Sequence, residues 1–504
     1  MDKLPGKNQS FWSTTAQAMS YPQLDEDIEI DTAVIGGGIS GILTAYFLAK
    51  EGQSVALLEA RELVSGTTGG TTAKLSSQHQ LIYDDLLQQD GLDVAKLYYE
   101  ANQEGQKLIK AIIDDHGIDC DYKVADSYVF SENIENTSSI EKEAEAYEKI
   151  GIEGGIADSI PVDLKVTSAL VMKKQAQFNP VKFLYAVLKE VDSLGGRIYQ
   201  HTRYMDSEKN GDQLILSTDT PFTVTCNQVV FATLFPAEDP DSFYSDTLKP
   251  VASHLTAFES PEAFDSGIYI SDDDPIRTFR GALNGDQCVL IIGGETHPKG
   301  DGKSTIEHYE AIQHYAKEEF RLTEFLGYWS EHDHTTPDRR PFIGKIQTDN
   351  DKMYVMTGYG KWGLAASATG AGIIKSLIVG EDNRFEKLFS PERQLPEDKG
   401  DRNESNETDE NHVVSPGSEQ MERQLAKGQA QSVEINGKPA GMYKDTDGNM
   451  HYLDLSCTHL GCEVKWNDGD QTWDCPCHGS TFDGTGKVLA GPAKEPLRTI
   501  DSLQ

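Results

Sequence analysis

Positive charge is scarce in this chain of 504 residues. Lys and Arg together number 45 against 82 Asp and Glu, which leaves a formal net charge of −37. We do not expect so acidic a chain to bind nucleic acid or an anionic membrane surface, because both are themselves negatively charged. The acidity is typical of a solvated surface suited to high ionic strength, and it would also steer a basic redox partner toward the protein.

Long apolar runs are also missing. The nearest approach to a membrane span, residues 363–380, is rich in small residues and is interrupted by Lys375. The first thirty residues lack the basic start and apolar core of a secretory signal. We therefore expect a cytoplasmic protein without membrane insertion. A hydrophobic content of 38% over this length is enough for more than one domain with a core of its own.

Cysteine is sparse, yet four of the seven cysteines fall in one span near the end of the sequence. The span contains Cys457-Thr-His-Leu-Gly-Cys and, a dozen residues later, Cys475-Pro-Cys-His-Gly-Ser. Cysteines and histidines at such spacing indicate either a mononuclear zinc site or an iron–sulfur site. Zinc takes four ligands and would leave two of the cysteines unexplained. The three cysteines outside this span are expected to be ordinary buried thiols; they are Cys120, Cys226 and Cys288.

The two loops resemble the two boxes of a Rieske [2Fe–2S] domain. In that family one iron is held by two thiolates and the other by two imidazoles. The resemblance implies thiolate ligands Cys457 and Cys475, imidazole ligands His459 and His478, and a disulfide between Cys462 and Cys477. Ser480, a usual hydrogen-bond donor to a ligand sulfur, is present, whereas Phe482 stands where high-potential relatives carry a tyrosine. Fewer hydrogen bonds to sulfur lower the potential, so we expect a middling value within roughly −150 to +300 mV.

A second motif lies near the start of the sequence. Residues 30–35 show a short apolar strand pattern, and Gly36-Gly-Gly-Ile-Ser-Gly opens a helix-like segment. A second apolar strand pattern, residues 55–58, ends at Glu59. This order of strand, glycine turn, helix, strand and acid predicts a dinucleotide-binding fold, with the phosphates at the helix N-terminus and Glu59 on a ribose. The sequence contains no second unit of this kind, so we expect no built-in NAD(P)H site.

The segments downstream resemble the glycine oxidase and D-amino-acid oxidase group of FAD-dependent oxidoreductases, over about residues 30–380. Five segments carry the resemblance: residues 66–73, 179–183, 228–233, 336–344 and 356–363. It implies FAD as the dinucleotide and an α/β Rossmann-like FAD-binding domain with an interleaved α+β substrate domain, followed by a small all-β Rieske domain. The residues expected to contact FAD are Gly36, Gly38, Ile39, Ser40, Gly41, Glu59, Arg61, Thr67, Thr68, Gly358, Gly360 and Gly363.

The expected domain plan has four parts. They are an N-terminal extension (1–29), an FAD-dependent oxidoreductase domain (30–390), an acidic flexible linker (391–416) and the Rieske domain (417–504). Within the oxidoreductase domain, the FAD parts are about 30–80, 180–235 and 341–380, and the substrate parts are about 81–179 and 236–340. The linker is dense in Glu, Asp, Asn, Ser and Pro with almost no large apolar residue, which is typical of a solvated segment. In the last domain the Asn436-Gly437 pair indicates a β-hairpin.

The substrate side offers few candidate residues. In amino-acid-oxidising relatives an arginine before the Thr-Pro-Asp segment clamps the substrate carboxylate, and here Asp333 stands in its place. An acid repels a carboxylate and attracts a cation, which favours an amine or polyamine over glycine, although Asp333 could equally be a surface acid. Tyr359 and Lys361 lie in the loop expected over the flavin. Lys361 could contact the flavin or a substrate anion, or the loop could simply pack its aromatic side chains there.

A flavin and a one-electron cluster in one chain predict a dehydrogenase. It would take a hydride from a small amine or amino-acid-like substrate and pass the electrons singly through the cluster to an external acceptor. In one rival hypothesis the cluster accepts electrons from a donor protein and reduces the flavin of a reductase or monooxygenase. In another the protein is a non-enzymatic redox sensor. A Rieske oxygenase is disfavoured, because it needs a mononuclear iron held by two histidines and a carboxylate, and the sequence shows no convincing set.

Overall fold

The computed structural model describes residues 7–264, 267–348, 350–396, 424–435 and 438–500. Three features of the predicted plan therefore lie outside the described residues. These are positions 1–6 of the N-terminal extension, positions 397–416 of the linker, and the Asn436-Gly437 pair. Among the helices of the described ranges, none combines the length and apolar character needed to cross a membrane.

The first sheet is organised around β2 (Ile28–Ile35). Its other strands are β3 (Val55–Leu58), β8 (Arg197–Tyr199), β9 (Tyr204–Asn210), β10 (Gln213–Thr218), β11 (Thr223–Phe231), β17 (Phe342–Lys345) and β18 (Met353–Thr357). The strand order is β17-β18-β11-β2-β3-β8, with the β9–β10 hairpin attached to β11, and the strands from β18 to β8 are parallel. Ala33, Val34 and Ile35 are all buried, as expected for a parallel strand covered on both faces.

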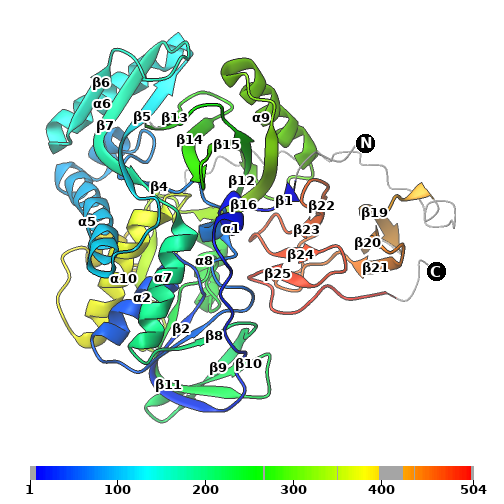
Figure 1. Cartoon of the computed structure of the whole chain (residues 1–504). Coiled ribbons are helices and arrows are strands. Elements are labelled where there is room, and N and C mark those ends of the chain that lie inside the picture. Colours follow the sequence, from blue (N-terminus) through cyan, green and yellow to red (C-terminus); the bar gives the residue numbers. More distant parts are fainter. Residues whose placement is uncertain (1–6, 265–266, 349, 397–423, 436–437, 501–504) are drawn as a thin grey trace.

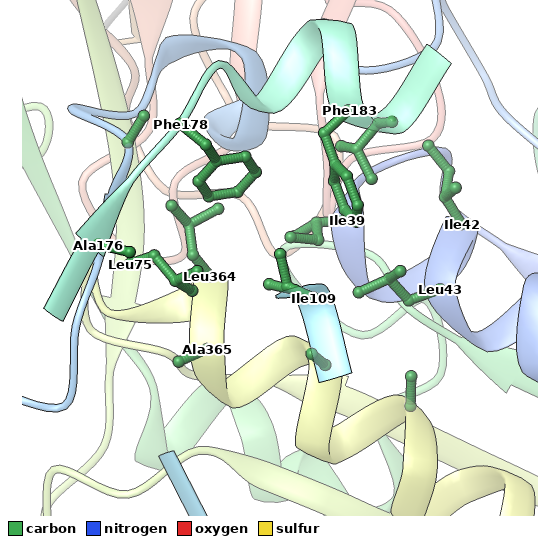
Figure 2. Packing of buried hydrophobic residues seen from close by; sticks show 14 of the residues in the cluster. Ile39, Ile42, Leu43, Leu75, Ile109, Ala176, Phe178, Phe183, Leu364 and Ala365 are labelled. Atoms are coloured by element: carbon green, nitrogen blue, oxygen red, sulfur yellow. The ribbon is translucent and has the colours of Figure 1, made fainter. Parts of the chain in front are cut away.

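Helices from distant parts of the sequence pack together beside this sheet. They are α2 (Ile39–Lys50), α5 (Leu92–His116), α7 (Pro180–Ser193) and α10 (Gly363–Val379). Helix α2 contacts α7 and α10, and α10 also contacts α5. Figure 2 shows Ile39 and Leu43 of α2, Phe183 of α7 and Leu364 of α10 gathered in one hydrophobic cluster. This core fixes the N-terminus of α2 against the sheet.

The second sheet is mixed and lies above the first in Figure 1. It contains β1 (Lys7–Asn8), β4 (Lys74–Leu75), β5 (Lys123–Ser131), β6 (Gly154–Ala157), β7 (Ser168–Gln177), β12 (Lys249–Glu259), β13 (Ile268–Ser271), β14 (Arg277–Asn284), β15 (Gln287–Pro298) and β16 (Phe325–Thr335). The order is β1-β16-β12-β15-β14-β13-β5-β7-β4, and β6 pairs with β7. Helix α9 (Thr305–Phe320) contacts β12 and β15, and α6 (Thr137–Ile150) contacts β6 and β7.

Short helices connect these layers. They are α1 (Phe11–Thr15), α3 (Thr67–Gly70), α4 (Tyr83–Gln89), α8 (Phe243–Thr247), α11 (Glu386–Phe389) and the 3₁₀ turns Ile134–Asn136 and Pro240–Ser242. The chain passes between the two sheets several times. The predicted α/β unit with a second, interleaved α+β unit is therefore confirmed.

The last part of the chain forms a separate β unit at the side of the main body (Figure 1). One small sheet has the order β19 (Gln429–Ile435), β20 (Lys438–Lys444) and β21 (Met450–Asp454). The other has the order β22 (Lys465–Asn467), β23 (Thr472–Asp474), β24 (Thr481–Asp483) and β25 (Val488–Ala490). Fully buried Trp473 packs with Leu453, Leu455 and Phe482 in its core.

Acidic side chains of this β unit hold it against the second sheet. Asp468 Oδ1 accepts hydrogen bonds from the backbone N–H of Thr305 (2.8 Å) and Ile306 (3.3 Å) at the start of α9. Asp470 accepts from the hydroxyls of Tyr309 (2.8 Å) and Ser330 (2.5 Å). Asp468 thus acts as a helix cap supplied by another domain, because it satisfies N–H groups that have no partner within the helix.

We predict that Asp468→Ala exposes the first turn of α9. A helix cap contributes about 0.5–2 kcal/mol, so hydrogen exchange at the amides of Thr305 and Ile306 should accelerate by about 2- to 30-fold. Exchange mass spectrometry of the intact protein would measure this. The exposed Asp447, on the same β unit, provides the matched control Asp447→Ala, which should leave α9 unchanged. Equal protection in both variants would contradict the capping role.

Candidate functional site

The turn from β2 into α2 is packed so tightly that a side chain does not fit at Gly36 or Gly41. Gly36 has φ +112°, and a Cβ there would lie 2.7 Å from the carbonyl oxygen of Ala232. A Cβ on Gly41 would lie 1.9 Å from the carbonyl oxygen of Gly36. The helix therefore begins directly at the strand end, and the residues at its start line a cavity of about 430 Å³. This is the arrangement in which a helix N-terminus binds phosphate.

Several predicted FAD contacts line this first cavity. They are Gly36, Gly38, Ile39, Ser40, Glu59, Arg61, Thr67, Thr68 and Gly363. The Glu59 carboxylate is held by the backbone N–H groups of Gly37 (2.7 Å) and Arg61 (2.8 Å), which fix it at the end of β3. Gly41 lies behind the cavity wall, where it allows the close approach to Gly36.

A second cavity of about 290 Å³ adjoins the first. Its walls include residues of β12, β15 and β16 together with the loop 358–362, so Gly358 and Gly360 line this cavity rather than the first. The residues that line both cavities are Thr67, Thr71, Glu331, His332, Asp333, Tyr359 and Lys361. The three candidate catalytic residues, Asp333, Tyr359 and Lys361, are therefore brought together at the boundary between the cavities.

Asp333 is buried at this boundary, with a relative exposure of 4%. Its carboxylate accepts hydrogen bonds from the backbone N–H groups of His334 and Lys361, both at 2.7 Å. Burial raises the pKa of Asp333 to about 6, although both hydrogen bonds act in the opposite direction. Asp333 is therefore not a surface acid. It ties β16 to the loop that carries Tyr359 and Lys361.

Two neighbouring groups also have shifted pKa values. Lys361 Nζ faces the open cavity and donates to Thr296 Oγ1 at 2.7 Å, and the surrounding protein lowers its pKa to about 8. The Tyr359 hydroxyl lies 2.9 Å from Ser40 Oγ at the start of α2, and burial raises its pKa to about 12. These side chains extend from the second cavity to the helix that bounds the first.

The sequence analysis did not identify two ionisable residues that line the second cavity. Lys74 Nζ donates to Thr278 Oγ1 at 2.6 Å and lies 5.1 Å from the centroid of the Trp362 ring. Burial, followed by nearby positive charge, lowers the pKa of Lys74 to about 7. Burial also raises the pKa of Glu331 to about 8. The cavity therefore has both acidic and basic groups, and no local motif marks either residue because their neighbours come from distant strands.

The two cysteine-containing loops form a compact site in the β unit. Cys462 and Cys477 are joined by a disulfide, as predicted. Cys457 and Cys475 are free, buried thiols. The rings of His459 and His478 lie 5.0 Å apart, and the Nδ1 atom of each is buried without a hydrogen-bond partner among the described residues. Two thiols and two imidazole nitrogens without partners are thus available as ligands.

These loops face the main body at the end of β16. The ring centroid of Phe235 lies 5.9 Å from that of His459 and 5.8 Å from that of His478, and Phe235 also lines the first cavity. His334 Nε2 lies 3.1 Å from the carbonyl oxygen of His478, and burial lowers the pKa of His334 to about 4. His334 is therefore neutral near pH 7, with its Nε2–H donating to the loop.

The β unit also closes part of the first cavity. Residues 489–494, together with Asp470, Thr472 and Thr481, contribute to its lining. Sequence reasoning did not predict this contact, because it joins segments more than 400 residues apart. Motif spacing carries no information about such a distant pairing.

Comparisons with known proteins agree with this geometry. A family model described as FAD dependent oxidoreductase matches residues 31–377, and a Rieske [2Fe-2S] domain model matches residues 418–501. The putative Rieske 2Fe-2S iron-sulfur protein YhfW of Bacillus subtilis (strain 168) is 37% identical over 98% of this chain and 97% of its own length. Gamma-glutamylputrescine oxidoreductase of Escherichia coli (strain K12) is 22% identical over 75% of this chain and 90% of its own.

The crystal structure of glycine oxidase from Geobacillus kaustophilus shares the fold. It aligns with a TM-score of 0.63 at 17% identity and covers 73% of this chain and 100% of its own. The expected fold class, an α/β FAD-binding domain with an interleaved α+β domain and a small all-β Rieske domain, is thereby confirmed.

The residues present fit both expected cofactors. The side-chain-free turn before α2 leaves room for a pyrophosphate, and the carboxylate of Glu59 is fixed at the end of the next strand. The paired thiols and the imidazole nitrogens without partners match the mixed donor set of a Rieske cluster. Together with the family matches, they identify an FAD enzyme with an iron–sulfur centre. The chain belongs to the FAD dependent oxidoreductase family and carries a C-terminal Rieske [2Fe–2S] domain.

Proposed function

We propose that this oxidoreductase is a dehydrogenase for a small amine or amino-acid-like substrate. It takes a hydride from the substrate into FAD and passes the electrons singly to an external acceptor through a cluster held by Cys457, His459, Cys475 and His478. Flavins exchange both hydride and single electrons, and the cluster exchanges one electron at a time; this is the chemistry that the two groups supply.

The position of Phe235 is the observation that supports this electron path. Its ring lines the cavity that fits FAD and also contacts the rings of His459 and His478. The backbone of β16 makes a second connection, because His332 and Asp333 line the same cavity while His334 hydrogen-bonds to the cluster loop. A docked cluster therefore supports direct transfer without a large movement of the domain.

The second cavity supports a substrate with an ammonium group. Asp333 is the acid on this cavity that is charged near pH 7, since the pKa of Glu331 is raised to about 8, and Tyr359 lies beside it. Lys74 and Lys361 lie on the same cavity, and no salt bridge joins either lysine to an acid within the described residues. A substrate that carries both an amine and a carboxylate would satisfy both kinds of group. Such a substrate is compatible with the name of one relative, gamma-glutamylputrescine oxidoreductase.

We predict that Asp333→Asn lowers kcat/KM for amine substrates and removes the fall of kcat/KM at low pH, called here the acid limb of the pH profile. An ionic hydrogen bond contributes about 1.5–3 kcal/mol, so kcat/KM should fall by about 10- to 100-fold, mainly through KM. In the unaltered enzyme kcat/KM should rise with pH through about 6, because Asp333 must lose its proton to attract an ammonium group. Anaerobic flavin bleaching with γ-glutamylputrescine, putrescine and glycine would measure both effects.

The exposed Asp351 provides the matched control Asp351→Asn, which should keep the acid limb and the rate. An Asp333→Asn enzyme that retains FAD and still shows the acid limb would contradict the substrate role. Rapid turnover of glycine with no response to putrescine or γ-glutamylputrescine would also contradict the preference for an extended amine.

The direction of electron flow can be tested by an anaerobic redox titration of the full-length protein. Flavin absorbance and the EPR signal of the cluster would be followed together. We expect the cluster to have the higher midpoint potential, because electrons then pass downhill from substrate through FAD to the cluster. A cluster potential below that of the flavin would contradict the proposal and favour the cluster as the electron donor.

We predict that Ser480→Ala lowers the cluster potential. Ser480 Oγ accepts from the backbone N–H of Ala493 at 3.0 Å, and we expect its hydroxyl to donate to a ligand sulfur of the cluster. Loss of a hydrogen bond to a charged sulfur, about 1.5–3 kcal/mol, corresponds to a fall of about 60–130 mV for one electron. The exposed Ser432 of β19 supplies the control Ser432→Ala. An unchanged potential in Ser480→Ala would show that this hydroxyl does not tune the cluster.

A further inference from the structure

Three histidines from separate elements meet away from both cavities. They are His254 of β12, His297 of β15 and His308 of α9. One ring nitrogen from each lies within 4.8 Å of those of the other two, and the Nε2 atoms of His254 and His297 are 3.0 Å apart. Their separation in the sequence matches no local metal-binding motif, so the sequence alone does not indicate the group.

Neighbouring groups orient two of the rings. His308 Nδ1 lies 2.9 Å from Glu295 Oε2, and Glu295 is in turn held by Arg277. His297 Nδ1 lies 2.9 Å from the carbonyl oxygen of Pro298 and 3.4 Å from Asp301 Oδ2. When Nδ1 donates to such acceptors, the lone pair of the ring is left on Nε2. Carboxylate and carbonyl partners of this kind orient histidines that bind metals.

One candidate ligand atom of the group lacks a partner. His308 Nε2 is buried without a hydrogen bond among the described residues. An unsatisfied buried nitrogen is costly, so it calls for an explanation such as an ion. His254 is fully buried, and its ring centroid lies 5.3 Å from that of His297 and 4.7 Å from that of Tyr309.

We propose that His254, His297 and His308 form a binding site for a divalent transition metal of the zinc type. Imidazole suits zinc and its neighbours in the first transition row, and three protein ligands leave a fourth position for water. Tetrahedral zinc with bonds of 2.0–2.1 Å places its ligand atoms about 3.3 Å apart. The pair at 3.0 Å is already close to that separation, whereas the ring of His308 stacks on both other rings and must turn to direct its nitrogen at the metal.

The site would stabilise the segment on which the Rieske domain docks. His297 and His308 flank residues 298–307, which comprise the last residue of β15, the connection and the start of α9. In this segment Lys299 Nζ pairs with Asp474 Oδ2 at 3.0 Å, and Thr305 binds Asp468. A metal bound to both flanking histidines and to His254 of β12 would fix the segment at both ends. The role is structural, and it does not depend on the substrate or on the direction of electron flow.

Zinc binding by the tag-free, full-length holoprotein tests the proposal. Protein with its full iron content is dialysed against zinc, and zinc and iron per chain are measured by plasma mass spectrometry. We expect one zinc per chain, and His308→Gln should weaken its affinity at least 100-fold. Glu295→Gln, which removes a carboxylate that orients His308, should weaken it about 10- to 100-fold. The exposed His314 on the same helix supplies the control His314→Gln, which should bind zinc normally.

Two further measurements decide where the metal lies. X-ray absorption at the zinc edge should report three imidazole nitrogens and one oxygen; sulfur ligands would place the zinc at the cysteine loops and overturn the proposal. Zinc should raise Tm of the unaltered protein and of His314→Gln by a few degrees, but not that of His308→Gln. The absence of stoichiometric zinc, or equal zinc binding by His308→Gln, would show that the three rings form only a packed histidine cluster.

Discussion

The buried ion pair between Lys299 and Asp474 is the contact on which the assembly of the two domains depends. Its side chains are 8% and 5% exposed, so each charge has lost nearly all of its hydration. Removing a charge from water costs several kcal/mol unless a partner compensates it. Asp474 immediately precedes the cluster-loop residue Cys475. The pair therefore aligns the second cluster loop with the oxidoreductase domain, and an undocked arrangement must hydrate both charges again.

Polar contacts rather than a large apolar surface surround this pair. Asp468 and Asp470 bind the start of α9 and the hydroxyl of Ser330, while Phe235 provides an apolar contact beside the histidine rings. Buried charge pairs are screened far less by salt than exposed ones. An acidic protein can therefore keep its two domains together at an ionic strength that would weaken association through its surface.

The parts of the site that the sequence predicted are those encoded within short segments. Each of these motifs depends on residues that are close together in the sequence, so the spacing of the residues indicates the local geometry. They are the glycine turn before α2, the acid Glu59 that ends β3, and the two cysteine loops. Asp333 was predicted through the neighbouring Thr-Pro-Asp segment, and the structure places it beside Tyr359 and Lys361 at the cavity boundary. Its role in substrate binding stays a prediction.

The parts that could not be predicted depend on contacts between distant segments. Lys74 and Glu331 reach the second cavity only because β4 and β16 belong to one sheet. Gly358 and Gly360, which were expected at the flavin, line the second cavity, and their contact with the flavin stays a prediction. Whether an ionisable group faces solvent or a cavity depends on the packing of the whole sheet. No short sequence pattern predicts that packing.

The wall that residues 489–494 contribute to the first cavity has a consequence for how the enzyme is assembled. The cavity is complete only when the Rieske domain is folded and docked, since its other side is closed by α2 and the first sheet. The oxidoreductase domain on its own would therefore present only part of this pocket, and a flavin bound there would contact both domains.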